Sequence, residues 1–302
     1  HVRSRRQRQM CIRDRLIGSL DEDEVEDDDF DLTAALEAAA FVERGDIWTV
    51  GRHRLVCGDA TNAGDIELLM DGKKANLVLT DPPYNVAFES SDGLSIKNDK
   101  MSADAFYEFL LAAFTQMAGV CEKGASAYVF HADTEGLNFR RAFQDAGFKL
   151  SGCCIWVKDS LVLGRSPYQW QHEPVLYGWV KTGKHTWYAD RKQTTVWRFD
   201  KPRRNADHPT SKPLDLLAYP IGNSTQANAI VLDTFAGSGS TLMACEATNR
   251  IAYCMELDEK YASVILRRYA DATGDAAGIT CLRDGQQLAY LDVVKAVDRG
   301  KK

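Results

Sequence analysis

Short runs of apolar residues alternate with longer amphipathic segments along most of this chain. Strands this short and uniformly apolar are typical of strands buried on both faces, which requires helices on both sides of a mainly parallel sheet. The sequence therefore predicts an α/β fold. Strands are predicted at 47–50, 53–57, 76–80, 125–131, 150–157, 174–179, 230–234 and 251–256, and helices at 32–44, 62–71, 102–121, 134–146, 213–222, 240–249 and 258–271.

The two ends of the chain stand outside this alternation. Residues 1–15 resemble translated adapter sequence and are interpreted as artefactual. Residues 21–31 contain nine acids in eleven positions, which predicts a solvated linker. We therefore predict disordered material at 1–31, a folded domain at 32–271 and a C-terminal extension at 272–302.

Composition narrows the class of protein further. No run approaches the roughly 18 apolar residues that cross a membrane, and the basic N-terminus lacks the apolar core of a secretory signal. The eight cysteines contain no CxxC pair and no metal-ligand spacing, which indicates reduced thiols and no bound metal. The sequence thus predicts a cytoplasmic protein.

The net charge is −6, but basic residues are concentrated in one stretch. Positions 156–214 hold eleven Lys or Arg against five acids, interleaved with aromatic residues, and 158–206 breaks the strand–helix alternation. This pattern favours an inserted region that faces the phosphates of nucleic acid, although a mixed-charge surface over an aromatic core is the alternative. The candidate DNA-binding residues are Lys158, Arg165, Arg191, Lys192, Arg198, Arg203 and Arg204.

A buried strand followed by a glycine turn and a helix is predicted at 230–240. Glycines there let the backbone approach a ligand closely, and the free N–H groups of a helix N-terminus suit an anion. A tight strand–helix connection alone would also explain the turn. The next strand, however, ends in Glu256-Leu257, where an acid can accept hydrogen bonds from the two hydroxyls of a ribose. Together the two features favour a nucleoside-containing cofactor.

Asp81-Pro82-Pro83-Tyr84 directly follow another buried strand. Consecutive prolines fix the backbone and donate no hydrogen bond, so the carbonyl groups there can point outward as acceptors. The Asp81 carboxylate and the Pro82 carbonyl could each take one hydrogen of an aromatic amino group, which would localise the nitrogen lone pair. Tyr84 offers a flat face for stacking a base. A proline turn with a capping Asp is the structural alternative.

Three motifs in this chain together resemble those of DNA amino-methyltransferases of the beta group, which use S-adenosylmethionine. Asp81–Tyr84 is similar to the family's DPPY motif, His208–Pro213 to its HPTxKP motif and Asp233–Ser240 to its glycine-containing cofactor loop. The order, with DPPY first and the glycine loop last, is that group's permuted order. The resemblance runs from about Gly45 to Tyr269.

The resemblance implies a Rossmann-like, seven-stranded, mostly parallel sheet with helices on both faces and S-adenosylmethionine as cofactor. It implies that Asp81, Pro82, Pro83 and Tyr84 are catalytic. Thr234 and Ala236 replace the family's usual proline and first glycine with small residues. The residues implied to bind the cofactor are Asp59, Asp81, Thr210, Lys212, Pro213, Asp233, Phe235, Ala236, Gly237, Ser238, Gly239, Ser240, Glu256 and Leu257.

The implied reaction is methylation of adenine N6 in double-stranded DNA after base flipping. Adenine is favoured because the family's adenine enzymes usually carry Asp where its cytosine-N4 enzymes carry Ser. Cytosine-N4 methylation, methylation of protein or RNA, and an inactive DNA-binding remnant stay open as alternatives.

The expected setting is a bacterial or phage-encoded enzyme of a restriction-modification type. A homodimer, a restriction endonuclease and an upstream ParB-like domain stay open as partners. His172-Glu173 are interpreted as structural, because methyl transfer needs no imidazole base.

Overall fold

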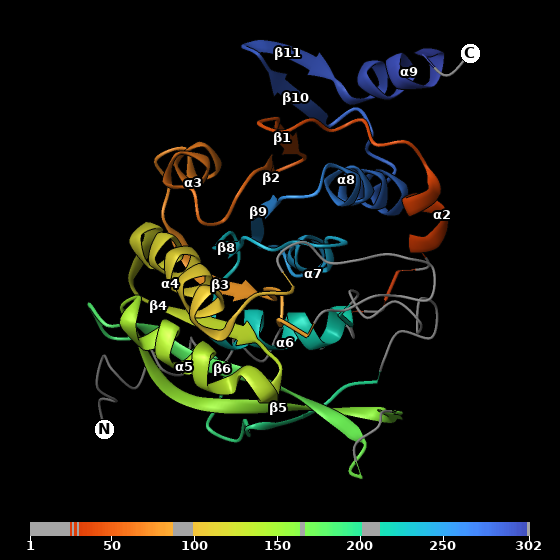
Figure 1. Ribbon diagram of the computed structural model, residues 1–302. Helices are drawn as coiled ribbons and strands as arrows, with labels where there is room; N and C mark the ends of the chain where they lie inside the picture. Colours follow the sequence, from red (N-terminus) through yellow and green to blue (C-terminus); the bar gives the residue numbers. More distant parts are fainter. Residues whose placement is uncertain are drawn as a thin grey trace, which may run out of the picture.

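The structure, a computed structural model, describes Val25, Asp27, Asp28 and residues 30–86, 99–163, 167–200 and 212–300. Strands within these ranges form one continuous sheet in the order β11-β10-β1-β2-β9-β8-β3-β4-β6-β5-β7 (Figure 1). The strands are β1 (Ile47–Val50), β2 (His53–Cys57), β3 (Ala75–Thr80), β4 (Cys121–Phe130), β5 (Phe148–Val162), β6 (Trp170–Val180), β7 (Val196–Arg198), β8 (Ile230–Asp233), β9 (Ile251–Glu256), β10 (Ile279–Arg283) and β11 (Gln286–Ala289).

The seven central strands, from β2 to β5 in sheet order, are the predicted core. β2, β9, β8, β3 and β4 are parallel neighbours, and β6 runs antiparallel between β4 and β5. The sheet is nevertheless larger than predicted. β1 and the β10–β11 hairpin extend it beyond β2, and β7 pairs with the outer side of β5. The hairpin turns at Asp284-Gly285, where both residues have positive φ.

Helices cover both faces of the sheet, as predicted (Figure 1). One face packs against α3, α4 and α5 and the other against α6, α7 and α8. The helices are α2 (Leu32–Glu37), α3 (Ala63–Met70), α4 (Ala103–Val120), the 3-10 turn η1 (Asp133–Glu135), α5 (Gly136–Asp145), α6 (Leu214–Ser224), α7 (Ser240–Ala247), α8 (Glu259–Thr273) and α9 (Tyr290–Gly300).

Helix α2 is shorter than the predicted 32–44. It ends at Glu37, and the chain continues in an extended conformation. The backbone N–H groups of Phe41 and Val42 then donate to Ser263 Oγ on α8, at 3.0 and 3.1 Å. Phe41 and Val42 are buried in the main core. The tertiary contact with α8 therefore overrides the helix propensity of the Ala-rich run.

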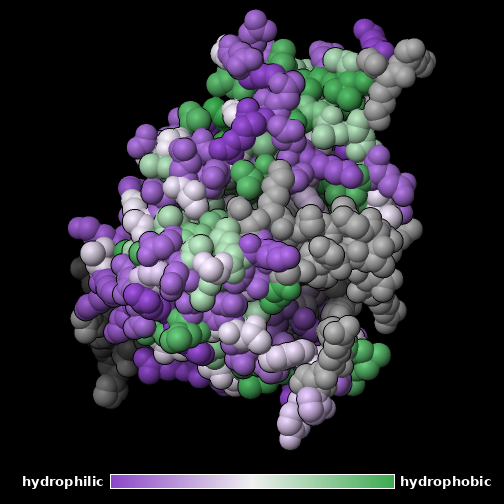
Figure 2. Space-filling model, viewed as in Figure 1, coloured by the Kyte–Doolittle hydropathy of each residue, from purple (hydrophilic) through white to green (hydrophobic). Residues whose placement is uncertain are grey.

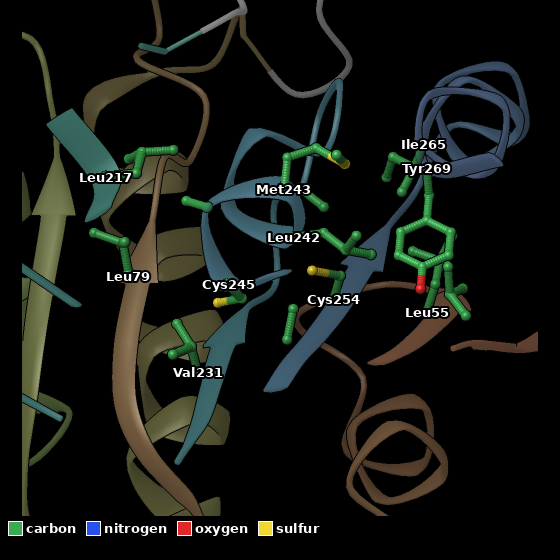
Figure 3. Packing of buried hydrophobic residues seen from close by; sticks show 14 of the residues in the cluster. Leu55, Leu79, Leu217, Val231, Leu242, Met243, Cys245, Cys254, Ile265 and Tyr269 are labelled. Carbon is green, nitrogen blue, oxygen red and sulfur yellow. The ribbon is translucent and has the colours of Figure 1, made fainter. Parts of the chain in front are cut away.

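The core on the α6–α8 face places α7 directly behind the strands that carry the glycine loop. Figure 3 shows Leu242 and Met243 of α7 between the sheet and Ile265 of α8, with Val231 of β8 and Cys254 of β9 nearby. Leu242 and Val231 are fully buried. Close packing on this scale makes the loop between β8 and α7 a rigid element.

The segment predicted to be an insertion at 158–206 is built into the sheet. β5 runs on to Val162, β6 spans Trp170–Val180 and β7 pairs in parallel with β5. Gly178 explains how closely the β5–β6 pair approaches, because a Cβ there would lie 2.1 Å from the carbonyl oxygen of Lys149. Strand pairing therefore fixes three segments of this basic stretch, at 158–162, Trp170–Val180 and Val196–Arg198.

The C-terminal extension adds the β10–β11 hairpin and α9 at one end of the molecule. The face in Figure 2 is mostly hydrophilic, with hydrophobic residues gathered toward the end that β11 and α9 occupy in Figure 1. Leu282 of β10 and Leu291 of α9 are 44% and 46% exposed. In the described ranges, no helix has the length and apolar character that a bilayer crossing requires.

Candidate active site

The two motifs singled out in the sequence meet at the same edge of the sheet. β3 and β8 are parallel neighbours, with Leu77 opposite Val231 and Val78 opposite Leu232. At their carboxyl ends the Thr80 hydroxyl donates to Asp233 Oδ1 at 2.7 Å. Thr80 directly precedes Asp81, and Asp233 begins the glycine loop. The proline turn and the glycine loop therefore lie next to each other at the carboxyl ends of two neighbouring strands.

Asp233 organises the start of the glycine loop. Its Oδ1 atom also accepts from the backbone N–H of Phe235 at 3.1 Å. Burial raises the pKa of this carboxyl to about 6, against the opposing hydrogen bonds from Thr241 and Thr80. The start of the loop backbone is thus held by a buried side chain behind it.

The glycines of the loop are required by its geometry. Gly237 and Gly239 have φ of +52° and +85°, values that L side chains rarely adopt. A Cβ on Gly239 would also lie 3.1 Å from two side-chain carbons of Ile265 on α8. Ala236, which replaces the family's first glycine, is buried and keeps a backbone hydrogen bond to Met255 O at 3.0 Å. This substitution therefore fits the turn.

Glu256 lies at the end of β9, facing the glycine loop. Its Oε2 accepts from the backbone N–H of Gly237 and its Oε1 from that of Asp258, both at 2.8 Å. Burial raises the pKa of Glu256 to about 7, although both backbone hydrogen bonds lower it. The carboxyl is thus tied to the loop and titrates near neutrality.

The end of β2 lies beside Glu256 as well. The backbone N–H of Gly58 donates to Glu256 O at 3.0 Å. The side chain of the next residue, Asp59, accepts from the backbone N–H and the hydroxyl of Thr61 through Oδ1. Asp59 and Glu256 thus lie near the ends of two neighbouring parallel strands.

Arg268 holds the glycine loop from the side of α8, a role that the sequence did not reveal. Its guanidinium donates to the Ser238 carbonyl oxygen and to the Ser240 hydroxyl, both at 3.1 Å. Two further bonds, at 2.6 and 3.0 Å, reach the Asp28 carboxylate. Arg268 is 4% exposed, so this is a buried charge pair. Ser238 and Ser240 are accordingly occupied by Arg268.

The acidic stretch predicted to be a solvated linker therefore contacts the domain. Asp28 pairs with Arg268, and Asp27 Oδ1 accepts from the backbone N–H of Leu214 at the start of α6, at 2.7 Å. The expectation of full solvation is wrong for these two residues. Composition could not show this, because the partners lie about 190 and 240 positions away in sequence.

Asp81 is the most exposed member of a buried charge cluster. Its side chain is 27% exposed, and its Oδ2 lies 2.6 Å from the Nζ atom of Lys212, which is 7% exposed. The Lys212 ammonium also reaches Glu173 Oε1 at 2.9 Å. Lys212, implied by the resemblance to bind the cofactor, thus holds two carboxylates in this structure. Pro213 follows it and precedes α6.

Tyr84 bridges the two carboxylates of the cluster. Its hydroxyl contacts Asp81 Oδ1 and lies 2.6 Å from Glu173 Oε1. Its ring meets Phe139 edge-on, with centroids 6.4 Å apart. Glu173 was interpreted from the sequence as structural, and the structure places it in the site. Glu173 reaches the cluster because β6 is antiparallel and therefore begins at the edge where its parallel neighbours end.

The charges of the cluster constrain one another. Burial raises the pKa of Asp81, and the Lys212 ammonium opposes that rise. Burial alone would also raise the pKa of Glu173, yet Lys212 and Lys158 lower it to about 2. Burial would lower the pKa of Lys212, but the two carboxylates raise it. Glu173 and Lys212 thus stay charged, and Asp81 is the carboxyl of the pair that more readily takes up a proton.

The predicted DNA-binding residues divide into three groups. Lys158 is 15% exposed and lies 2.9 Å from Glu173 Oε2, so it belongs to the charge cluster rather than to an open phosphate-facing surface. Arg191, Lys192 and Arg198 are exposed on and before β7. Arg165, Arg203, Arg204 and the predicted cofactor residue Thr210 lie outside the described residues.

The residues around the glycine loop fit an adenosyl group. Thr234 Oγ1 is buried and has no hydrogen-bond partner among the described residues. Leu257 is half-buried beside Glu256, and Phe235 is half-buried with its ring 5.9 Å from that of Phe109. Half-buried apolar side chains beside the Glu256 carboxylate offer both packing and polar contacts to a nucleoside.

Comparison with known proteins decides the family. A family model described as DNA methylase matches residues 75–267. The chain belongs to this DNA methylase family. The methylase is 30% identical over 208 residues to YubD of Escherichia coli K12, a protein named as a methylase, covering 69% of this chain and 86% of YubD. It is 28% identical over 229 residues to the DNA adenine methyltransferase YhdJ of the same organism, covering 65% and 76%.

Solved structures show the same fold in the methylase. A complex of M1.HpyAVI with SAM superposes with a TM-score of 0.54 at 22% identity, covering 71% of this chain and 98% of that one. The cytosine-N4-specific PvuII DNA methyltransferase superposes with a TM-score of 0.57 at 15% identity, covering 82% and 94%. The Rossmann-like methyltransferase fold predicted from the sequence is confirmed.

Proposed function

We propose that this DNA methylase transfers a methyl group from S-adenosylmethionine to adenine N6 in double-stranded DNA. The observation that supports it most directly is the hydrogen bond between Thr80 and Asp233, which joins the strand end that carries Asp81 to the glycine loop. A donor held at the loop and an amino nitrogen held at Asp81 would then lie in one pocket. The adenine-specific name of YhdJ supports the choice of base.

Each residue group of the candidate site would have its own role in the reaction. Gly237 and Gly239 would bring the loop backbone against the cofactor, and Glu256 would accept hydrogen bonds from its ribose. When bound, S-adenosylmethionine supplies a methyl group on a positively charged sulfur. The target base, flipped from the duplex at a cost of a few kcal/mol, would present its amino group to Asp81 and the Pro82 carbonyl. Both acceptors would localise the lone pair that attacks the methyl carbon.

Exposed basic residues would hold the DNA backbone. Arg191, Lys192 and Arg198 lie on and before β7 at the outer edge of the sheet, and phosphate contacts by such side chains position a duplex without reading its sequence. A restriction endonuclease and an upstream ParB-like domain remain proposals for the partners of this chain.

Cytosine N4 is the second candidate target. Both target atoms are exocyclic amino nitrogens on an aromatic ring, so the same acceptors could hold either, and the PvuII enzyme with the same fold is cytosine-N4-specific. Cytosine-N4 enzymes of this kind usually carry Ser at the position of Asp81, so the Asp in this chain favours adenine.

One assay separates these targets. The protein is incubated with S-adenosylmethionine labelled on the methyl group and with mixed-sequence duplex DNA, and the DNA is digested to nucleosides. Label in N6-methyladenine is expected. Label in N4-methylcytosine would correct the base, and the absence of label from DNA would contradict the proposal. Asp81→Ala should abolish transfer while S-adenosylmethionine still binds.

A further inference from the structure

The charge cluster behind Asp81 contains more than methyl transfer requires. Lone-pair localisation needs an acceptor at Asp81, but the cluster adds Tyr84, Lys212, Glu173 and Lys158 in one connected set. Glu173 is 8% exposed and Lys212 is 6% exposed. Because burying charges is costly unless each one is paired, a set this complete indicates a use for every member.

A proton is missing from the bridge between the two carboxylates. The Tyr84 hydroxyl contacts Asp81 on one side and Glu173 on the other. A phenol has one proton to donate, and an ionised carboxylate has none. When both carboxylates are ionised, one of the two contacts therefore brings together two oxygens with no proton between them. The bridge is complete when Asp81 carries a proton and donates it to Tyr84, while Tyr84 donates to Glu173.

Asp81 is the place where such a proton would arrive. Its side chain is 27% exposed, whereas that of Glu173 is only 11% exposed. The reaction in the proposed function releases one proton. The target nitrogen forms a bond to the methyl carbon, and the electron pair of the broken carbon–sulfur bond stays on sulfur. The nitrogen is then positively charged and must lose one hydrogen as a proton.

We propose that Glu173 is a positioning residue that makes Asp81 the acceptor of this proton, acting through Tyr84 and opposed by Lys212. The inference rests on the proposed function. The N–H bond of the methylated nitrogen breaks, its electron pair stays on nitrogen, and the proton moves to Asp81. The new carboxyl group donates to Tyr84, whose own proton turns to Glu173. The charge of Glu173 thereby stabilises the protonated state of Asp81, and Lys212 keeps Asp81 ionised beforehand.

Groups on every neighbouring element enter this balance. The charge of Glu173 raises the proton affinity of Asp81, whereas Lys212 and the hydrogen bond from Tyr84 lower it. Asp233 at the end of β8 and Asp81 repel each other, His131 directly after β4 is influenced by the charge of Glu173, and Lys158 of β5 pairs with Glu173. Glu173 and Lys212 carry opposite charges. Removing the charge of Glu173 should therefore shift the acid limb of the pH–rate profile one way, and removing that of Lys212 should shift it the other way.

The test measures single-turnover methylation of adenine against pH, with saturating S-adenosylmethionine and duplex substrate. In Glu173→Gln, the midpoint of the acid limb should fall by about one pH unit, and the plateau rate should fall as well. In Lys212→Met, the midpoint should rise by a similar amount. Glu173→Asp restores the charge and should return the midpoint toward the wild-type value even if the rate stays low.

A midpoint that stays unchanged or rises in folded Glu173→Gln would overturn the inference. S-adenosylmethionine affinity and the melting temperature report whether each variant folds. If Glu173→Gln does not fold, Lys212→Met decides the matter, and a midpoint that fails to rise in that variant would overturn the inference. Failure of the proposed function looks different, because the wild-type protein itself would then leave adenine unlabelled.

Discussion

The affinity for S-adenosylmethionine should weaken as the pH falls from 8 to 6. The perturbed group is Glu256, whose pKa burial raises to about 7. In the proposed function its ionised form accepts hydrogen bonds from the ribose hydroxyls. With a pKa near 7 in the free protein, roughly nine-tenths of the carboxyls are ionised at pH 8 and about one-tenth at pH 6. If binding selects the ionised form, Kd should rise by about tenfold over this range.

Isothermal titration calorimetry across this pH range measures the effect. Glu256→Gln removes the titration and places an amide NH2 against one of two backbone N–H donors, from Gly237 and Asp258. Its Kd should be weaker than that of the wild type at pH 8 and nearly flat with pH. Glu259→Gln, three residues along on an exposed helix start, should keep the wild-type slope. A wild-type Kd that varies less than twofold would refute the assigned role of Glu256.

Two further predictions concern stability. Gly178→Ala places a Cβ 2.1 Å from a backbone carbonyl oxygen of β5, so it should lower the melting temperature sharply. Gly152→Ala, whose Cβ would have no atom within 4 Å, should not. Equal melting temperatures of the two variants would refute the steric argument. Asp28→Asn should destabilise the fold by about 3 kcal/mol in urea unfolding, because it leaves the buried Arg268 charge unpaired. Arg141→Gln breaks an exposed ion pair and should lower the free energy of unfolding by less than about 1 kcal/mol. Equal losses of unfolding free energy in Asp28→Asn and Arg141→Gln would refute the argument from burial.

The central elements were predictable because their patterns are local. β3, β8 and β9 are short, mainly apolar runs that end in polar residues, and the predicted bounds of these strands and of β2 agree with the structure to within one residue. The β10–β11 hairpin and α9 were not predicted. Edge strands are buried on fewer sides, as the exposed residues of β11 show, and such strands lack the continuous apolar run by which a central strand is recognised.

The residues of the candidate site also divide into those with a local sequence signal and those without one. Motif residues Asp81, Asp233 and Glu256 could be placed because each ends a predicted strand at the ligand edge. Glu173 could not be placed with them, because its role depends on β6 running antiparallel, and direction is a property of sheet pairing. Arg268 was missed for a similar reason, since its partners in the glycine loop and in the acidic stretch lie far away in sequence.

The adjacency of β3 and β8 has a consequence for how the protein is made. The bond between Thr80 and Asp233 joins positions 153 residues apart. During synthesis, β3, β4, β5, β6 and β7 leave the ribosome in one uninterrupted stretch and can pair among themselves. β2 must wait for β9, and β3 for β8. A nascent chain could therefore assemble the half that carries Asp81 before the half that carries the glycine loop and Glu256.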